Sequence, residues 1–189
     1  MNDERIKTYA DLKFFIKQDF AARKVKFSIM RLCNPLIRFT ILLRIHEYLQ
    51  SNKIFGLSLL VKIWFRALSL KLGFSIPAHV FGPGLCIVHY GTIIVSPFAS
   101  VGRNCRMHAC VNIGGQAGFY APEDAINLAP RIGDNSYIGP GAKIFGAIQI
   151  GNNCAIGANA VVNKSYSDHG LLLIGIPARP VDRKSNNEN

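Results

Sequence analysis

Residues 132–162 read IGDNSYIGPGAKIFGAIQIGNNCAIGANAVV, and this stretch decides the fold. Neither the 3.6-residue period of a helix nor the two-residue period of a flat strand explains its strict period of six. Gly or Asn follows most of the periodic residues, and a small residue usually stands four places after each of them. The periodic residues are all aliphatic and β-branched: Ile132, Ile138, Ile144, Ile150, Ile156 and Val162.

A single hexapeptide is too short to bury its own aliphatic residue, so neighbouring units must stack to form a continuous core. The β-branched residue points inward, the small residue fits a crowded corner, and Gly or Asn adopts a turn conformation with positive φ. Three such sides close one turn of a triangular prism of roughly eighteen residues. The pattern therefore predicts a mainly β fold of parallel strands coiled around an aliphatic core.

The period of six also runs through the preceding part of the chain, with one early irregularity. Eight residues separate Ile87 from Val95, so two extra residues are inserted in the span that contains His89. An insertion in a strand ladder disturbs the pairing and re-aims a side chain outward, as bulges do near functional sites. We therefore expect the His89 side chain to leave the wall of the coil.

A second, larger interruption separates Ile113 from Ile132 by nineteen residues, and its sequence is rich in Gly, Ala and Pro. It predicts a loop over residues 115–131 that leaves the prism wall, a place where binding residues are common. Residues 163–170 leave the coil after the last hexapeptide, and residues 171–181 return along it. The polar tail over residues 182–189 is expected to be disordered.

Residues 1–73 are predicted to be helical. Apolar residues recur there at helical spacing, with breaks at Asn34–Pro35 and at Ser51–Asn52. This part of the chain carries fourteen basic and five acidic residues through Phe74, a net charge of +9 out of +11 for the 189 residues. Such helices could rest on an anionic membrane as a cationic, amphipathic surface. The alternative is a small helical bundle that packs on the coil and helps an oligomer assemble.

The composition of the chain argues against nucleic-acid-binding, secreted and membrane-spanning proteins. The helices carry no recognisable nucleic-acid-binding motif, and charge alone is weak evidence for such a role. Five cysteines without a CxxC pair indicate reduced packing residues and a cytosolic setting. The first residues lack the apolar core of a signal peptide. The chain has no run of about 18 uncharged apolar residues, so a membrane-spanning helix is not expected.

The coil resembles a known family. GPGLCIVHYGTIIV at 82–95, VNIGG at 111–115, the hexapeptides from residue 130 and GIPARPV at 175–181 together resemble the catalytic part of the serine acetyltransferase branch of hexapeptide acyltransferases. The resemblance covers residues 74–181 and implies a left-handed parallel β-helix. It also implies acetyl-CoA as co-substrate, transfer to a hydroxyl group, and homotrimers that pair further in some cases, with sites between neighbouring prisms.

The resemblance assigns the catalytic base to His89. An alcohol is a weak nucleophile at neutral pH, and imidazole can take its proton as the oxygen attacks a thioester carbonyl. His108 occupies a turn position and is a candidate to line the same cleft and bind the acceptor. His79 is expected to be structural. Some left-handed β-helices bind zinc through three histidines, so a metal-dependent hydratase is a further alternative, although the chain has no paired His motif and we expect no metal.

Binding residues follow from position and from the resemblance. Glu123 and Asp124, in the loop, are acidic candidates for holding the acceptor or orienting His89, and exposed loop charges are the other interpretation. The coenzyme is expected to lie along the outside of the coil. The resemblance implies that its pantetheine arm lies against small residues and that two cations meet its phosphates; these residues are Gly141, Ala142, Gly157, Ala158, Lys164 and Arg179.

The sequence departs from the serine enzymes at four positions that bear on the acceptor. Charged groups that the resemblance implies for orienting the base and gripping an amino acid are replaced by Phe74, Val88, Leu128 and Ala129. The sequence therefore predicts an acetyl-CoA-dependent O-acetyltransferase acting on a sugar hydroxyl of a surface polysaccharide or its lipid-linked precursor, at the cytoplasmic side of a membrane. The alternatives are serine O-acetylation for cysteine synthesis and a noncatalytic scaffold that uses the helices for interaction.

Overall fold

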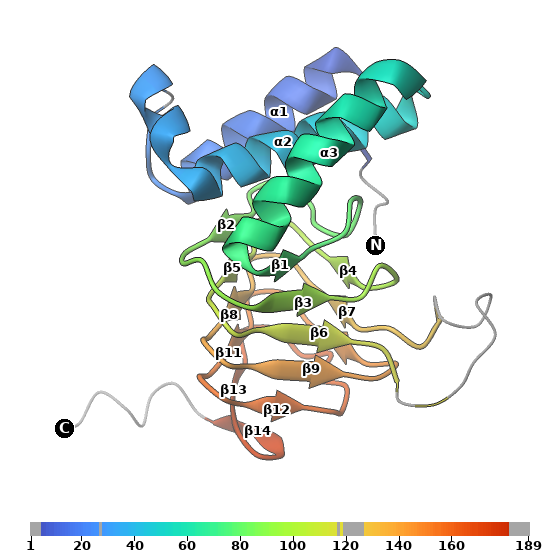
Figure 1. The fold of residues 1–189 in the computed structure, drawn as a ribbon. Helices are drawn as coiled ribbons and strands as arrows, with labels where there is room; N and C mark the ends of the chain where they lie inside the picture. The colour runs from blue at the N-terminus through green and yellow to red at the C-terminus, as the bar shows by residue number, and fades with distance from the viewer. Residues whose placement is uncertain (1–4, 27, 117, 119–126, 182–189) are drawn as a thin grey trace.

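The chain forms a three-sided coil of short parallel strands with a layer of helices at one end (Figure 1). The computed structural model describes residues 5–26, 28–116, 118 and 127–181. One sheet has the order β1-β3-β6-β9-β12, a second β10-β7-β4 and a third β14-β13-β11-β8-β5-β2. Successive strands from β1 to β13 therefore belong to different sheets, which is the arrangement that the hexapeptide period predicted.

The strands are two to four residues long, as short sides of a narrow prism require. The five-stranded sheet contains β1 (Phe74–Ser75), β3 (Ile93–Val95), β6 (Asn112–Gly114), β9 (Lys143–Phe145) and β12 (Val161–Val162). The three-stranded sheet contains β4 (Ser100–Val101), β7 (Arg131–Ile132) and β10 (Gln149–Ile150). The six-stranded sheet contains β2 (Cys86–Ile87), β5 (Arg106–Met107), β8 (Tyr137–Ile138), β11 (Ala155–Ile156), β13 (Leu172–Gly175) and β14 (Ala178–Val181).

The aliphatic residue of each hexapeptide stacks on its equivalent in the next coil. In the six-stranded sheet, Ile87 pairs with Met107, Met107 with Ile138 and Ile138 with Ile156. These side chains are fully buried, as are those of the other periodic residues from Ile132 to Val162 except Ile150, which is 4% exposed. The predicted aliphatic core is confirmed, and it runs the length of the prism.

The turns between strands use the residues that tolerate positive φ. Asn104, Asn135 and Asn153 have φ between 54° and 59° and occupy the same corner in successive coils. Their side chains form a ladder, because the Nδ2 of each of the first two donates to the Oδ1 of the next at 2.9 Å. Asparagine therefore serves both as the turn former and as a cross-link between coils at this corner.

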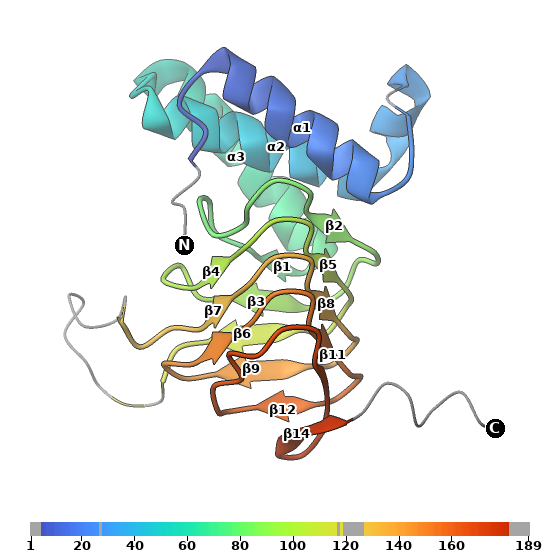
Figure 2. The same ribbon diagram turned by 180° about the vertical axis from the view of Figure 1, so that it is seen from behind.

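The predicted helices are present at the N-terminal end. They are α1 (Tyr9–Ala22), α2 (Pro35–Ser51) and α3 (Phe55–Leu72), with a 3₁₀ turn, η1 (Ile29–Cys33), between the first two. A capping box at Thr8 starts α1, and the Asn34 side chain caps α2 ahead of Pro35. Figures 1 and 2 show α2 between α1 and α3, so α3 forms an outer layer. None of the described helices is long and apolar enough to cross a membrane.

A buried polar network joins the helical layer to the first coil. Arg44 of α2 is fully buried and donates hydrogen bonds to the carbonyl oxygens of Phe81 and Gly82 at 2.9 and 2.8 Å. Its guanidinium also pairs with the carboxylates of Asp19, at 2.9 Å, and Glu47, at 3.0 Å. These two carboxylates raise the pKa of Arg44 above its ordinary value although burial opposes it, so the cation persists inside the protein.

The two carboxylates complete the docking by accepting backbone hydrogen bonds from the coil. Asp19 accepts from the N–H groups of Gly84 and Leu85 at 2.8 and 2.7 Å, and Glu47 accepts from the N–H of His79 at 2.8 Å. Apolar contacts from the coil core surround this network. The position of the first coil, and of the strand that leads to His89, is thus fixed by side chains of α1 and α2.

We expect Arg44→Leu to lower the free energy of unfolding by about 3–5 kcal/mol, because it leaves two buried carboxylates without their cation. Urea unfolding followed by circular dichroism measures this change. The matched control is Arg38→Leu, which removes an exposed arginine from the same helix and should leave the midpoint nearly unchanged. Equal midpoints for the two variants would contradict a stabilising role for the network.

Candidate active site

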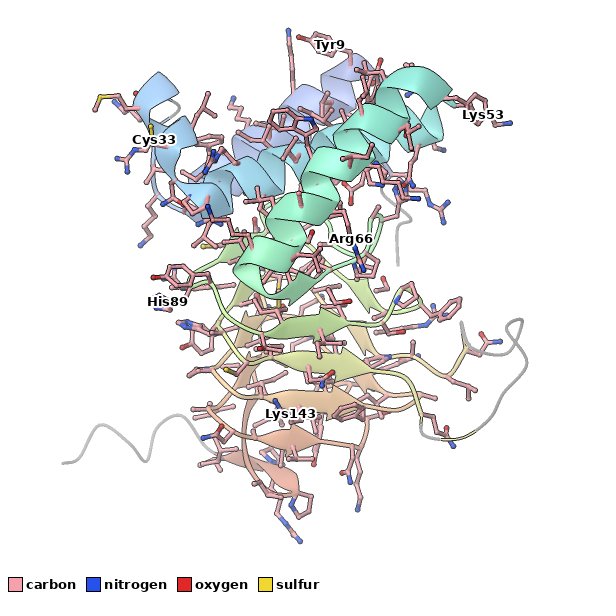
Figure 3. The ribbon with its side chains drawn as sticks, in the orientation of Figure 1. Tyr9, Cys33, Lys53, Arg66, His89 and Lys143 are labelled. Atoms are coloured by element: carbon pink, nitrogen blue, oxygen red, sulfur yellow. The ribbon has the colours of Figure 1, made fainter. Side chains whose placement is uncertain are left out.

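His89 lies on the corner that follows β2, where the two extra residues are accommodated. Its side chain is exposed, and Tyr90 beside it is 69% exposed. Figure 3 shows His89 projecting from the edge of the coil just below the helical layer. No described residue forms a hydrogen bond with its ring, so both ring nitrogens are available to a substrate or to a neighbouring chain. The insertion thus presents an imidazole to the outside, as the interval of eight predicted.

His108 lies one coil further on, at the same corner. The centroids of the His89 and His108 rings are 5.9 Å apart. The Nε2 of His108 is buried and has no hydrogen-bond partner among the described residues. Burial lowers the pKa of His108, and the charges of Arg106 and His89 lower it further. His108 is therefore neutral at pH 7, so either tautomer can donate one hydrogen bond and accept another.

Two further residues of this corner were not predicted from the sequence. Tyr137 packs on the other side of His108, with ring centroids 5.1 Å apart. Arg106 is exposed, stands two residues before His108 and forms no ion pair with any described residue. Strand pairing aligns Arg106 of β5 with Cys86 of β2 on one side and with Tyr137 of β8 on the other. This alignment places Arg106 and Tyr137 near the histidine pair. Aligning the hexapeptides before and after the loop over residues 115–131 would have placed Arg106 beside Tyr137, but the length of that loop obscures the alignment.

Below the histidine pair, the same corner is built from small residues. His108, Gly139 and Gly157 follow each other from coil to coil, since the N–H of each bonds to the strand below. A Cβ on Gly157 would lie 2.7 Å from Cγ2 of Ile174, so glycine is needed there for the coils to approach. Gly141 has φ 75°, a conformation that favours glycine. These glycines therefore allow successive coils to approach each other, and we call this part of the corner the low corner.

The predicted coenzyme residues fall in two groups. Gly141, Gly157 and the exposed Ala158 lie along this low corner, whereas the methyl group of Ala142 is fully buried and only its backbone could meet a ligand. Two exposed cations stand at the far end of the prism: Lys164 follows β12 of the five-stranded sheet, and Arg179 is in β14 of the six-stranded sheet.

The other predicted residues lie elsewhere. Glu123 and Asp124 fall outside the described residues. His79 belongs to the network under α2, because its N–H donates to Glu47, and it does not approach the histidine pair. Among the described residues, no three His, Cys, Asp or Glu side chains gather as a metal site would require.

Phe74 packs against Phe39 at 4.9 Å between ring centroids, so it belongs to the contact between helices and coil.

Comparison with known proteins agrees with this geometry. Residues 129–164 match the family model described as bacterial transferase hexapeptide (six repeats). The chain is 29% identical over 175 residues to the serine acetyltransferase of Synechococcus elongatus, covering 92% of this chain and 67% of that protein. It is 31% identical over 105 residues to the serine acetyltransferase of Mycobacterium tuberculosis, covering 56% of this chain and 43% of that protein. This chain therefore spans about two thirds of the first relative's length and less than half of the second's.

A solved structure supports the fold assignment. A serine acetyltransferase in complex with CoA matches with a TM-score of 0.69 at 24% identity, over 92% of this chain and 71% of that chain. The stacked hexapeptides and the parallel sheets agree with the family model, which matches residues 129–164. The relatives of this chain and the solved structure are serine acetyltransferases, which confirms the resemblance seen in the sequence.

These comparisons correct the predicted acceptor. The sequence predicted a sugar hydroxyl of a surface polysaccharide, and that prediction is wrong, because the relatives are named serine acetyltransferases and support the alternative. The error has a physical origin. The replacement of charged groups by Leu128 and Ala129 indicated that no charged group remained to bind an amino acid. The structure has another exposed cation, Arg106, two residues before His108, and its charge lowers the pKa of that histidine.

We expect the pKa of His108 to lie below its ordinary value and to rise in Arg106→Gln, because that substitution removes a positive charge that disfavours the imidazolium form. The rise should be partial, since burial is the larger cause and persists. NMR titration of the imidazole resonances, assigned with His108→Gln, measures it. Arg131→Gln, at an exposed arginine of another sheet, should leave the value unchanged. A pKa at or above the ordinary value in the unmodified protein would refute this electrostatic picture.

Proposed function

We propose that this protein transfers the acetyl group of acetyl-CoA to the hydroxyl of serine, with His89 as the general base. The observation that carries the proposal is the exposed His89 ring, lifted out of the coil by a two-residue insertion and paired with His108 at 5.9 Å. An exposed imidazole without an internal hydrogen-bond partner is suited to take a proton from a bound alcohol. The named activity of the relatives supplies the reaction class.

In this mechanism, His89 takes the proton of the hydroxyl group as its oxygen attacks the thioester carbonyl carbon. The carbon–sulfur bond then breaks, and the imidazolium returns the proton to the departing sulfur. His108 is neutral at pH 7 and can donate a hydrogen bond to the acceptor or to the oxyanion from a tautomer protonated on Nε2. Its lowered pKa favours this role over that of a second cation.

Serine brings a carboxylate into the site, and Arg106 is the group that we assign to it. Arg106 is exposed, lies close enough to His108 for its charge to lower the histidine pKa, and has no acidic partner among the described residues. A guanidinium binds a carboxylate through two parallel hydrogen bonds, which fixes orientation as well as charge. The planar faces of Tyr137 and His108 would then bound the space between the carboxylate and the hydroxyl group.

The path of acetyl-CoA follows from the low corner below the histidines. The pantetheine arm would pass the half-buried Gly141 and Gly157 and the exposed Ala158, and its thioester would reach His89. Lys164 and Arg179 at the far end of the prism are suited to the phosphates. Because these cations stand on different sheets, the coenzyme would lie between two neighbouring prisms, each supplying one of them.

A homotrimer would create this shared groove. The walls of the prism expose apolar side chains that a neighbouring chain could cover, including Ile94 at 44%, Phe98 at 41% and Phe145 at 37% exposure. Ile94 and Phe145 lie on the five-stranded sheet, which adjoins the His89 corner. A neighbour on this sheet would also bring its own side chains near the His89 ring, which forms no hydrogen bond with a described residue of its own chain. The trimer would thereby complete the site.

We expect His89→Ala to lower kcat by about 10²- to 10⁴-fold, the contribution typical of a positioned general base. Loss of thioester absorbance measures turnover, and it avoids thiol reagents that would react with the exposed Cys33 and Cys110. The matched control is His79→Asn, which keeps the backbone N–H and suits the positive φ of that position. Turnover by His89→Ala equal to that of the control would exclude His89 as the base.

We expect Arg106→Gln to raise KM for serine by about 10- to 150-fold, as the loss of a hydrogen-bonded charge pair implies. The KM for acetyl-CoA should stay unchanged in Arg106→Gln. Arg106→Lys should recover part of the affinity for serine, because lysine keeps the charge but not the paired hydrogen bonds. The control Arg131→Gln should have the same KM for serine as the unmodified enzyme. Initial rates with serine, threonine and a neutral oligosaccharide as acceptors complete the test. Faster acetylation of the oligosaccharide, or an unchanged KM for serine, would overturn the assigned acceptor.

A further inference from the structure

Helix α3 has two apolar faces, and only one of them is used by the fold. Phe65, Ser69 and Leu72 are buried against α2 and the first coil. On the opposite side, apolar residues at spacings of three, four and seven residues form an outer stripe. We define the outer stripe by its exposed members: Leu59 (61%), Leu60 (58%), Ile63 (56%) and Leu70 (68%).

Aromatic and cationic residues border the outer stripe. Trp64 is 71% exposed and Phe55, at the start of the helix, is 80% exposed. The flanking cations are all exposed as well: Lys53, Lys62, Arg66 and Lys71. Residues 53–72 contain no aspartate or glutamate. Figures 1 and 3 show this helix on the outside of the helical layer, with Lys53 projecting from the turn before it and Arg66 projecting from the helix on the side of the coil.

This combination identifies the partner by its chemistry. We propose that the outer stripe of α3 binds the surface of an anionic lipid bilayer. Apolar and aromatic side chains of an interfacial helix enter the boundary between headgroups and acyl chains, while flanking lysines and arginines meet anionic headgroups. The helix would lie in the plane of the surface, since it is not apolar enough to cross it. The proposal is independent of the acetyl-transfer reaction.

A second copy of the chain is the competing occupant, and the charges disfavour it. Pairing two outer stripes would bring Lys62, Arg66 and Lys71 of one copy near the same cations of the other. The helix carries no acidic residue that could pair with them across the seam. Like charges at such a margin destabilise association, whereas an anionic surface gains from each of them. The same cations that oppose self-association therefore favour a membrane.

The position of Trp64 gives the test a direct probe, because it is the only tryptophan in the chain. Full-length protein is mixed with vesicles of phosphatidylglycerol and phosphatidylcholine, or of phosphatidylcholine alone. We expect the Trp64 emission to shift to the blue and the protein to sediment with the anionic vesicles only. Both signals should weaken as salt is raised. An emission that is unaffected by anionic vesicles overturns the proposal.

Variants separate the apolar from the charged contribution. Lys62→Gln combined with Arg66→Gln should weaken vesicle partitioning about 25-fold, roughly fivefold for each cation. Leu60→Ser combined with Ile63→Ser should abolish the shift, whereas Ile176→Ser, at a 74% exposed residue in the coil, should not. Binding retained by the double serine variant overturns the proposal. So does lipid-free self-association through α3, detected by light scattering and by a concentration-dependent Trp64 emission. Acetyl transfer in lipid-free solution should be the same for all variants.

Discussion

The stacking of one aliphatic side chain per hexapeptide is the constraint on which the structure depends. No coil can bury its own residue, so each is stable only on its neighbours, and every side of the prism must keep its length. If a side of the prism has more than six residues, the extra ones cannot stay in the wall without displacing an aliphatic residue from the core. They must leave the wall at a corner. The chain has such extra residues before Val95 and before Ile132. The first of these departures carries His89, so the site results from the regularity that surrounds it.

The second requirement of a stacked fold is that its ends be closed, and the two ends are closed differently. At the C-terminal end, β13 and β14 form an antiparallel pair, and the Tyr166 hydroxyl donates to the carbonyl oxygen of Ala178 at 2.6 Å. At the N-terminal end, Arg44 and its two carboxylates satisfy backbone groups of the first coil that no further strand could pair. This network lies close in the chain to β2 and therefore supports the strand that ends beside His89.

Much of this arrangement could be predicted from the sequence, because local rules determine it. The period of six specifies which residues are buried, Asn34–Pro35 marks the start of α2, and the interval of eight places His89 outside the wall. Arg44 could not be recognised, since a buried arginine and an exposed one look the same in an amphipathic helix. Arg106 and Tyr137 were missed for another reason. Their alignment with each other spans the loop over 115–131, whose length hides the register of the coils on either side.

The acceptor was the least predictable property, because Arg106, the group that we propose to bind its carboxylate, is not part of the motifs that carry the family resemblance. Comparing residue types one by one showed charged groups replaced by Leu128 and Ala129, and it suggested a neutral acceptor. Arg106 lies on β5, in register with Cys86 and Tyr137, and its charge lowers the pKa of His108. Leu128 and Ala129 precede β7 of another sheet, so this cation does not stand in the place of the replaced groups. The electrostatic requirement for an amino-acid acceptor is thus better judged from the register of the coils than from any single motif.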